Sequence, residues 1–223
     1  MCYKKHSMNK KNLNVNLKEI LYKFPDLKEI YIKFKKQLLI FKKKSYVIAV
    51  SGGPDSLALV ALSKVFNQEK KTNFHYVLVN HNIRKNSYNE ALQVKNLLKK
   101  NKIKLHICSN KKRIERNIQG KARNIRYELL SKYCLEKKIN AILTAHNLED
   151  QVETFFIRLS RGSGLTGLSA MKVESKLTRN ILLLRPLLNT KKNLLIKITK
   201  NVFGKYFKDP TNNNTKYLRT KIR

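Results

Sequence analysis

A Gly- and Ser-rich string between two apolar runs is the first stretch of this sequence whose residue types could do chemistry. Ser51-Gly52-Gly53-Pro54-Asp55-Ser56 follows the β-branched run 47–50 and precedes the Leu- and Ala-rich run 57–62. The two runs predict a buried strand and then a helix packed on a sheet. Backbone N–H groups of such a turn, the helix dipole and the hydroxyls of Ser51 and Ser56 can bind an anion. A bare Gly-Gly corner would fit an ordinary strand–turn–helix connection, but the complete string favours phosphate binding.

A second candidate site combines a histidine with carboxylates. His146, Glu149 and Asp150 follow the apolar run 140–145, where a strand would deliver them to the edge of a sheet. Carboxylates in this setting can hold a Mg²⁺ ion that neutralises phosphate charge, with Asp55 opposite them. Two other interpretations stay open. Glu149 and Asp150 also suit the first turn of a capped helix, and His146 also suits a structural role at the rim.

A third string places two arginines around a Gly- and Ser-rich corner. Arg158 and Arg161 flank the start of Gly162-Ser163-Gly164, whose backbone could form an anion-binding nest. The same composition fits a flexible loop. The sequence contains no Gly-x-x-x-x-Gly-Lys-Ser/Thr, so a Walker A phosphate loop is excluded.

Apolar runs alternate with segments of helical period along most of the chain. Strands are predicted at 47–50, 74–79, 103–108, 140–145 and 181–184, with helices near 91–98, 120–138, 150–160 and 190–203. This alternation indicates a doubly wound α/β domain with a mostly parallel sheet and helices on both faces. Ligands bind at the carboxyl ends of the strands in such a fold, which is where the string after residue 50, Asn80-His81 and His146 fall.

The charge balance of the 223 residues is strongly basic. Lys and Arg total 49 against 14 acidic residues, which gives a formal net charge of +35. This excess indicates a polyanionic partner, most simply nucleic acid, although part of it fits the codon usage of an AT-rich genome. Three cysteines without a Cys-x-x-Cys fit a reducing cytosol and no disulfide, zinc or iron–sulfur site. No apolar run suits a membrane span or a signal peptide, so we expect a cytoplasmic protein without membrane contact.

The three strings together resemble one family, the tRNA(Ile)-lysidine synthases of the PP-loop, or N-type ATP pyrophosphatase, superfamily. Its members combine Ser-Gly-Gly-x-Asp-Ser with Ala-His-x-x-Asp-Asp-Gln-x-Glu-Thr and Arg-Gly-Ser-Gly-x-x-Gly-Leu-x-x-Met, and this sequence carries similar strings at 51–56, 145–154 and 161–171. Weaker matches lie at 80–84, 121–127, 184–187 and 209–212, with Arg219 and Arg223. The resemblance covers roughly residues 45–223.

The resemblance implies a fold like the adenine nucleotide alpha hydrolases and a two-step ligation. ATP and Mg²⁺ would adenylate the C2 oxygen of the wobble cytidine in tRNA(Ile) with a CAU anticodon, and free L-lysine would then displace AMP. The product, lysidine, changes the codon from AUG to AUA and the tRNA identity from Met to Ile. The oligomeric state stays open, with a homodimer as one option.

The resemblance also assigns roles to individual residues of this sequence. The catalytic candidates are Asp55, Arg123, His146 and Asp150, and the Mg²⁺ candidates are Asp55, Glu149 and Asp150. The ATP-binding candidates are Ser51, Gly52, Gly53, Pro54, Asp55, Ser56, His81 and Arg84. The candidates for contact with tRNA or lysine are Arg126, Glu153, Arg158, Arg161 and Ser163. Arg123 and Arg126 also fit an exposed pair on one helix face.

The sequence departs from the family pattern in three respects. Asn80 and Glu149 each stand where an Asp is usual, and the chain stops at Arg223, where members continue into a C-terminal tRNA-binding region. We therefore expect a PP-loop catalytic domain at 45–223 without that region. It would follow a basic extension at 1–44, which comprises a disordered lead at 1–15 and short amphipathic helices interrupted at Pro25.

Three other functions remain open at this stage. Thiolation of a tRNA cytidine uses the same adenylation but normally needs paired cysteines, which are absent. A small-molecule adenylating enzyme, such as an NAD or GMP synthetase, does not need a charge of +35. A basic nucleic-acid-binding relic that has lost turnover would also fit the shortened chain and Asn80.

Overall fold

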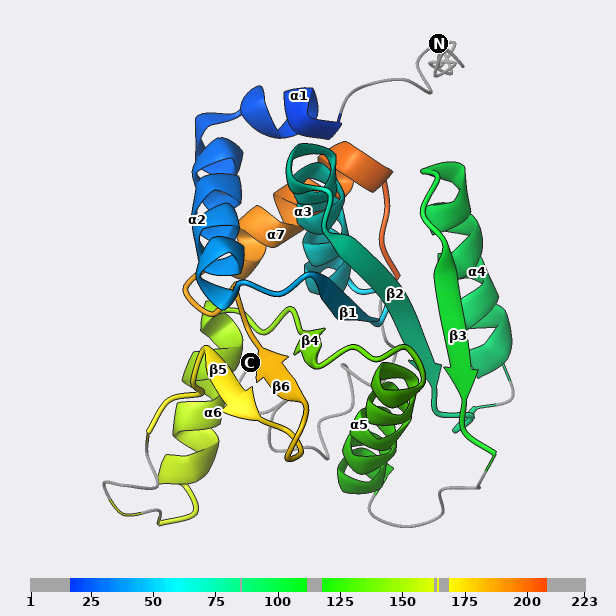
Figure 1. The fold of residues 1–223 in the computed structure, drawn as a ribbon. Coiled ribbons are helices and arrows are strands. Elements are labelled where there is room, and N and C mark those ends of the chain that lie inside the picture. The colour runs from blue at the N-terminus through cyan, green and yellow to red at the C-terminus, as the bar shows by residue number, and fades with distance from the viewer. Residues whose placement is uncertain (1–16, 85, 112–117, 163, 165–168, 208–223) are drawn as a thin grey trace, which may run out of the picture.

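The computed structural model describes residues 17–84, 86–111, 118–162, 164 and 169–207. Its six strands form one sheet in the order β3-β2-β1-β4-β6-β5, in which only β5 runs antiparallel to its neighbour (Figure 1). The strands are β1 (Ser45–Val50), β2 (Asn73–Asn80), β3 (Leu105–Ser109), β4 (Ala141–Leu143), β5 (Glu174–Lys176) and β6 (Leu182–Leu184). The prediction of a mostly parallel, doubly wound sheet is confirmed. The expected disordered lead at 1–15 lies outside the described residues.

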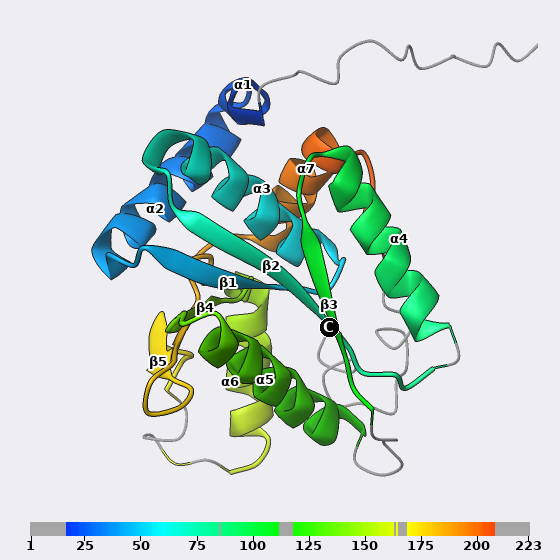
Figure 2. The same cartoon turned by 45° about the vertical axis from the view of Figure 1, so that its right-hand side comes forward.

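Helices cover both faces of the sheet. They are α1 (Leu17–Tyr22), α2 (Pro25–Phe41), α3 (Pro54–Lys70), α4 (Ser87–Lys100), α5 (Ile118–Glu136), α6 (Leu148–Leu159) and α7 (Lys192–Phe203). Figures 1 and 2 show α2 and α3 on one side of the strands and α5 and α6 on the other. None of the helices in the described part of the chain is long and apolar enough to cross a membrane.

The alternation of side chains along β1 divides the core into two layers. Tyr46 and Ile48 point into the larger layer with residues of α2, α3, α4 and α7, whereas Val47 points into a smaller layer under α5. Successive side chains of a strand face opposite sides, so a central parallel strand must be apolar on both. This explains the unbroken apolar run at 46–50.

Pro25 marks the start of the second N-terminal helix. Pro25 occupies the first turn of α2, where its missing N–H has no helical partner to lose. Leu27 and Phe34 of α2 are fully buried in the larger core layer, together with Leu21 of α1. The described part of the N-terminal segment is thus packed on the α/β sheet.

A partly buried ion pair joins this N-terminal segment to α3. The carboxylate of Glu69 on α3 lies 2.8 Å from the ammonium of Lys18 and 2.5 Å from that of Lys35. Burial alone would raise the pKa of Glu69, but the two ammonium groups outweigh it and lower the pKa to about 2. Glu69 therefore stays ionised in the folded protein at pH values where it would be protonated in the unfolded chain.

We predict that Glu69→Gln lowers the free energy of unfolding by about 2 kcal/mol at pH 7, and by much less near pH 3. The folded-state pKa lies below the unfolded value, so the stabilisation is complete above about pH 5 and is lost as the pH falls toward 2. Urea denaturation of both proteins at the two pH values measures this. Equal differences at pH 7 and pH 3 would contradict the prediction. Glu29→Gln, in a pair exposed on α2, is the control.

Candidate nucleotide-binding site

The strand order places three candidate segments side by side at one edge of the sheet. β1 lies between β2 and β4. From β1 the chain first builds the sheet outward through β2 and β3, and then returns to the other side of β1 to add β4 and β6. Ligands in open α/β sheets bind where the strand order reverses, outside the carboxyl ends of the strands. Ser51, His81 and Thr144 follow β1, β2 and β4 directly. Their juxtaposition is therefore a consequence of the topology.

The loop after β1 has a backbone that requires glycine at one position. Gly52 has a φ of +84°, and a Cβ built there would lie 2.5 Å from Cγ2 of Val94 on α4. Either fact alone excludes a side chain without rearrangement. Gly53 then forms the N-cap of α3, and Pro54 starts the helix. The loop thus directs the first turn of α3, whose N–H groups have no intrahelical acceptors, toward the carboxyl edge of the sheet.

The two serine hydroxyls of the loop bind its own backbone. Ser56 Oγ accepts a hydrogen bond from the N–H of Ser51 at 3.1 Å and donates to the carbonyl of Gly53 at 3.0 Å. Ser51 Oγ donates to Ser56 Oγ at 3.1 Å and accepts from the N–H of Gly53 at 3.3 Å. We expected these hydroxyls to be donors to a ligand. In this structure they hold the shape of the loop.

Helix α7 and the segment that follows it support the loop from behind. The hydroxyl of Thr199, which is fully buried, donates a hydrogen bond of 2.6 Å to the carbonyl of Pro54. The N–H of Phe207 donates to the carbonyl of Gly52 at 3.0 Å, and its ring approaches the same glycine. Two carbonyls at the loop therefore receive hydrogen bonds from a distant part of the sequence.

The second string begins helix α6 with a reciprocal cap. Asn147 Oδ1 accepts from the N–H of Asp150 at 3.0 Å, and Asp150 Oδ2 accepts from the N–H of Asn147 at 3.1 Å. This is the capping-box geometry, so the alternative of a capped helix describes Asp150 correctly in this structure. His146 lies just before the cap, with Nδ1 2.9 Å from the hydroxyl of Thr144.

Glu149 connects this string to α7. Its two carboxylate oxygens accept from the N–H of Lys192 at 2.9 and 3.0 Å, at the start of α7. A carboxylate is favourable at a helix N-terminus because of the helix dipole. The family pattern has Asp at position 149. The longer side chain of Glu149 is used here to reach the N–H of Lys192.

The donor set fits a Mg²⁺ ion only in part. No group of three or more His, Cys, Asp or Glu within the described ranges is arranged to hold a metal by itself. Mg²⁺ at nucleotide sites usually takes one or two carboxylates and completes its shell with phosphate oxygens and water. Asp55, in the first turn of α3, and Asp150, in the first turn of α6, suit that role. Glu149 suits it less, because both of its oxygens accept the N–H of Lys192.

The turn after β2 uses the side chain of Asn80 as a hydrogen-bond acceptor. Asn80 is 4% exposed, and its Oδ1 accepts a 3.0 Å hydrogen bond from the N–H of Asn82, which has a φ of +55°. An amide supplies this acceptor without the cost of burying a charge. The turn places His81 Nε2 3.5 Å from the guanidinium of Arg126. Arg84 instead forms an ion pair of 2.9 Å with Glu90 on α4.

The two arginines of α5 differ in their surroundings. Both are exposed, and Arg123 stacks on Tyr127, with 5.1 Å between the guanidinium carbon and the ring centroid. Burial, with a smaller effect from the charge of Arg123, lowers the pKa of Arg185. Arg185 donates to the carbonyl of Lys172 at 2.8 Å. Arg126 is thus the arginine of α5 that approaches the site through His81.

The loop after α6 is tied back to the helix. The side-chain amide of Gln151 donates to the carbonyl of Met171 at 3.0 Å and accepts from its N–H at 2.7 Å. Arg158 donates to the carbonyl of Ser169, whereas Arg161 is exposed after the end of the helix. Glu153 is buried at 7% exposure. Ser163 lies outside the described residues, so the anion nest expected there stays a prediction.

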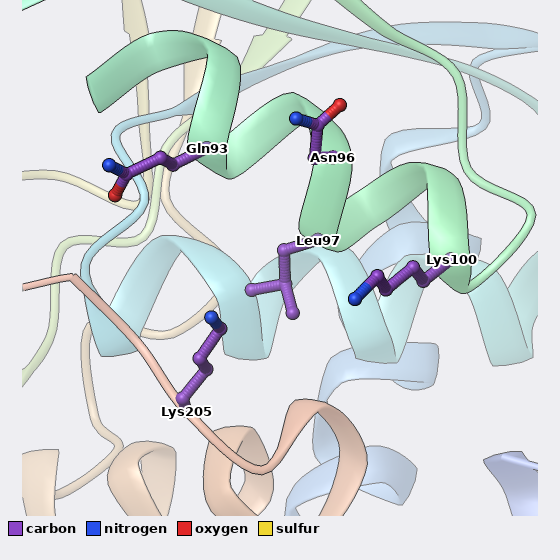
Figure 3. A pocket seen from close by; sticks show the side chains of 5 residues that line it. All are labelled: Gln93, Asn96, Leu97, Lys100 and Lys205. Atoms are coloured by element: carbon purple, nitrogen blue, oxygen red, sulfur yellow. The ribbon is translucent and has the colours of Figure 1, made fainter. Parts of the chain in front are cut away.

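A basic groove lies between α4 and the segment that supports the loop. It encloses about 170 Å³ and is lined by Gln93, Asn96, Leu97, Lys100 and Lys205. Figure 3 shows the side chains of Lys100 and Lys205 extending toward Leu97 from opposite sides. Among the described residues, none that lines the groove is acidic. It therefore suits an anion.

Several residues that shape the site escape prediction from the sequence. Thr199 lies in an amphipathic helix without a recognisable motif, and Phe207 acts through its backbone N–H, which carries no sequence signal. Asn147 and Gln151 belong to the second string. Asn147 caps α6 and Gln151 bonds the backbone of Met171, and these contacts exist only in the folded protein. The preference of Asn for helix N-caps was the one available signal.

Comparison with known families agrees with this geometry. A family model described as the PP-loop domain matches residues 26–223. The chain therefore belongs to the PP-loop family, whose fold and nucleotide loop it shows.

The sequence relatives are more specific. The protein named tRNA(Ile)-lysidine synthase of Orientia tsutsugamushi (strain Boryong) is 42% identical over 178 residues, which are 79% of this chain and 40% of the relative. The protein of the same name from Campylobacter jejuni (strain RM1221) is 38% identical over 186 residues, which are 83% of this chain and 56% of the relative. The chain thus spans about half the length of these curated relatives, or less.

Solved structures share the fold at lower identity. The U34-tRNA thiolase NcsA of Methanococcus maripaludis, solved with its [4Fe-4S] cluster, has a TM-score of 0.70 and 18% identity. The likeness covers 88% of this chain and 70% of that one. The FMN adenylyltransferase of Candida glabrata has a TM-score of 0.51 and 15% identity, over 82% of this chain and 62% of that one. At these identities the likeness concerns the fold alone.

We predict that Thr199→Val weakens ATP binding about tenfold, whereas Thr199→Ser leaves it within about twofold. Valine has a similar volume but no hydroxyl, so the carbonyl of Pro54 loses the hydrogen bond that ties the loop to α7, at a cost of about 1–3 kcal/mol. Calorimetric titration with ATP measures the affinity, and thermal unfolding measures the stability. If the Thr199 hydroxyl had a purely structural role, Thr199→Val would lower the melting temperature but would bind ATP as tightly as Thr199→Ser. Equal affinities of the two variants would contradict the prediction.

Proposed function

We propose that this chain is an ATP-dependent ligase that joins lysine to C2 of the wobble cytidine of tRNA(Ile) with a CAU anticodon, as a tRNA(Ile)-lysidine synthase. The observation that carries the proposal is the supported PP-loop beside the acidic start of α6, in a chain 42% identical to a protein of that name. Since its substrate would be tRNA, we place its action in the cytoplasm.

In the first step the C2 oxygen of the cytidine attacks the α-phosphorus of ATP. The bond between the α-phosphorus and the bridging oxygen breaks, and pyrophosphate leaves. In this proposal the N–H groups at the start of α3 hold the leaving phosphates, and Arg123 and Arg126 stabilise the charge that develops on the α-phosphate. Asp55 and Asp150 would hold Mg²⁺, which would neutralise phosphate charge when bound.

In the second step the neutral ε-amine of lysine attacks C2 of the adenylated base. A C–N bond forms, the C2–O bond breaks, AMP leaves and the amine nitrogen releases a proton to solvent water. Glu153 is the candidate for orienting the amine, because a carboxylate buried at 7% exposure lies one turn beyond Asp150. His146 and His81 are placed at the edge where the base would approach. The protein's contribution in both steps is mainly to position the reactants and stabilise charge.

The basic composition supports an RNA substrate. A charge of +35 gives the strong, salt-dependent attraction that binding to a phosphate backbone needs. We assign part of that binding to the groove of Lys100 and Lys205, which the segment 204–207 connects to the loop at Gly52. A target base in an anticodon loop is single-stranded and can be turned outward toward the ATP.

Thiolation of a tRNA base is the alternative that the fold suggests. The described cysteines do not favour it. Burial raises the pKa of the Cys134 thiol to about 12 and also raises that of Cys108, so neither is a ready thiolate. Both lie in or against the core layer under α5.

We predict that the protein forms AMP from ATP only when both tRNA(Ile) bearing CAU and lysine are present. Asp55→Ala should lower the rate by about 10²-fold or more, because Mg²⁺ would lose a carboxylate ligand and the phosphate charge would be less well neutralised. Glu29→Ala, which removes an exposed carboxylate of α2, is the matched control and should have no effect. The measurement is thin-layer separation of labelled AMP, with each component omitted in turn.

Three outcomes of this assay would contradict the proposal. AMP formation that needs a sulfur donor in place of lysine would indicate thiolation. AMP formation with lysine but no tRNA would indicate a small-molecule adenylating enzyme. Salt-sensitive tRNA binding with no AMP under any combination would indicate a binding protein without turnover.

We further predict that the double variant Lys100→Ala/Lys205→Ala binds tRNA about tenfold more weakly than the control Lys36→Ala/Lys132→Ala. Both doubles remove two exposed positive charges, but only the first removes them from the groove. The slope of log affinity against log salt should fall by about two units for the groove variant alone. Filter binding over a range of KCl concentrations measures both quantities. Equal losses would show that overall charge, and not the groove, determines binding.

A further inference from the structure

Arg185 is a buried charged side chain at the carboxyl edge of the sheet that neither ligation step uses. It follows β6 directly and is 7% exposed. Its N–H donates to the carbonyl of Val173 at 2.8 Å, which continues the pairing of β6 with β5 beyond the last residue of the strand. Leu183, two residues earlier, packs in the core layer under α5. Since alternate side chains of an extended segment share a face, Arg185 lies on the α5 side of the sheet.

The charge of Arg185 has no carboxylate to balance it among the described residues. Its Nη1 donates to the carbonyl of Lys172 at 2.8 Å and to Oγ of Ser175 at 3.0 Å, and both acceptors are neutral. Its Nε is buried and has no hydrogen-bond partner in the described part of the chain, where no carboxylate forms an ion pair with it either. A buried charge in this state is costly. A neutral side chain could donate the same hydrogen bonds at a lower cost, so these bonds alone do not explain an arginine at this position.

The electrostatic neighbours of Arg185 lie on α5. Burial, the largest cause, and the charge of Arg123 both lower the pKa of Arg185, whereas Tyr127 raises it. The ring of Tyr127 is partly buried against the core layer that contains Leu183. The guanidinium of Arg123 lies over this ring, with 5.1 Å between its carbon and the ring centroid. The three side chains therefore form a cluster that runs from the buried Arg185 to the exposed Arg123.

This cluster restricts the exposed arginine. An exposed arginine side chain samples many rotamers and loses that freedom when it binds a ligand. Here the ring of Tyr127 supports Arg123 on one side through a cation–π contact. The hydrogen bonds to Lys172 and Ser175 fix Arg185 in place. Its charge therefore repels the guanidinium of Arg123 away from the interior, and the repulsion is strong because burial lowers the effective dielectric constant.

We propose that Arg185 is a positioning residue, whose buried charge holds the guanidinium of Arg123 on the ring of Tyr127 and directs it toward the phosphates of a bound nucleotide. A cation that is already oriented stabilises developing charge without the cost of reorganisation. Arg185 acts through Arg123 and not by contact with the nucleotide, since it is buried and bonded to the protein. This role rests on the proposed function, in which Arg123 stabilises the charge on the α-phosphate.

A double-mutant cycle between Arg185 and Arg123 tests the proposal. We expect Arg185→Met, which keeps most of the apolar volume but removes the charge, to lower kcat for AMP formation about tenfold while KM for tRNA changes less than about twofold. In an Arg123→Ala background the same substitution should lower kcat by less than about twofold, because the residue through which it acts is gone. Arg185→Lys, which keeps the charge, should retain kcat within about threefold of the unchanged protein.

Ser175→Ala is the matched control. It removes one hydrogen-bond partner of Arg185 but leaves both guanidinium charges in place, so it should leave kcat unchanged. Thermal unfolding of every variant measures any loss of stability separately. A purely structural Arg185 would lower kcat equally with and without Arg123, and that result would overturn the proposal. A loss of kcat in Arg185→Lys as large as that in Arg185→Met would also overturn it.

Calorimetric titration with ATP separates the proposal from the ligase activity. A wild-type protein that forms no AMP with tRNA and lysine would contradict the proposed function alone. The same cycle measured on ATP affinity then decides the role of Arg185. A loss of about fivefold in Arg185→Met that disappears in the Arg123→Ala background supports the positioning role. An additive loss, or no loss in either background, overturns it.

Discussion

The hydrogen bonds that reach the back of the PP-loop are the constraint on which the site depends. A loop that points its N–H groups at a ligand points its carbonyls the other way, into the protein, where each must find a donor. The hydroxyl of Thr199 and the N–H of Phe207 supply these donors to Pro54 and Gly52. Glu149 then anchors the start of α7 to α6. Helix α7 thus contacts both the loop after β1 and the acidic start of α6.

The residues that interrupt the family pattern are explained by local contacts. Asn80 is a neutral acceptor in a buried turn, where a carboxylate would have to lose its hydration. Glu149 spans the distance from α6 to the N–H of Lys192. Each of the two side chains makes a hydrogen bond that shapes the site.

Much of the fold could be predicted from the sequence because its signals are local. The apolar run at 46–50 and the glycines that follow report burial and backbone conformation directly, and Pro25 marks the break between α1 and α2. The antiparallel strand β5 was missed because Glu174–Lys176 has no apolar period and is a strand only through its pairing with β6. The exposure of apolar side chains on α6, such as Phe155 and Phe156, could not be predicted, because periodicity shows that a helix has an apolar side but not what covers it.

Some residues of the candidate site could be predicted from local sequence signals, and others could not because they depend on tertiary contacts. The loop residues 51–56 and the acids of α6 could be named because their types and spacing indicate phosphate and carboxylate chemistry. Thr199, 145 residues from its partner Pro54, could not be named, since its role exists only after α7 packs on α3. The pairing of Arg84 with Glu90, rather than with a ligand, likewise depends on where α4 begins.

The distance in sequence between the loop and its supports has a consequence for synthesis. Domains form from the N-terminus as the chain leaves the ribosome, and β1, the loop and α3 emerge early. The carbonyls of Gly52 and Pro54 receive their partners only when α7 and Phe207 have emerged, close to the end of the described chain. A nascent chain can therefore assemble most of the sheet while its nucleotide loop is still incomplete. Competence to bind a nucleotide at this loop therefore waits for the segment that contains α7 and Phe207.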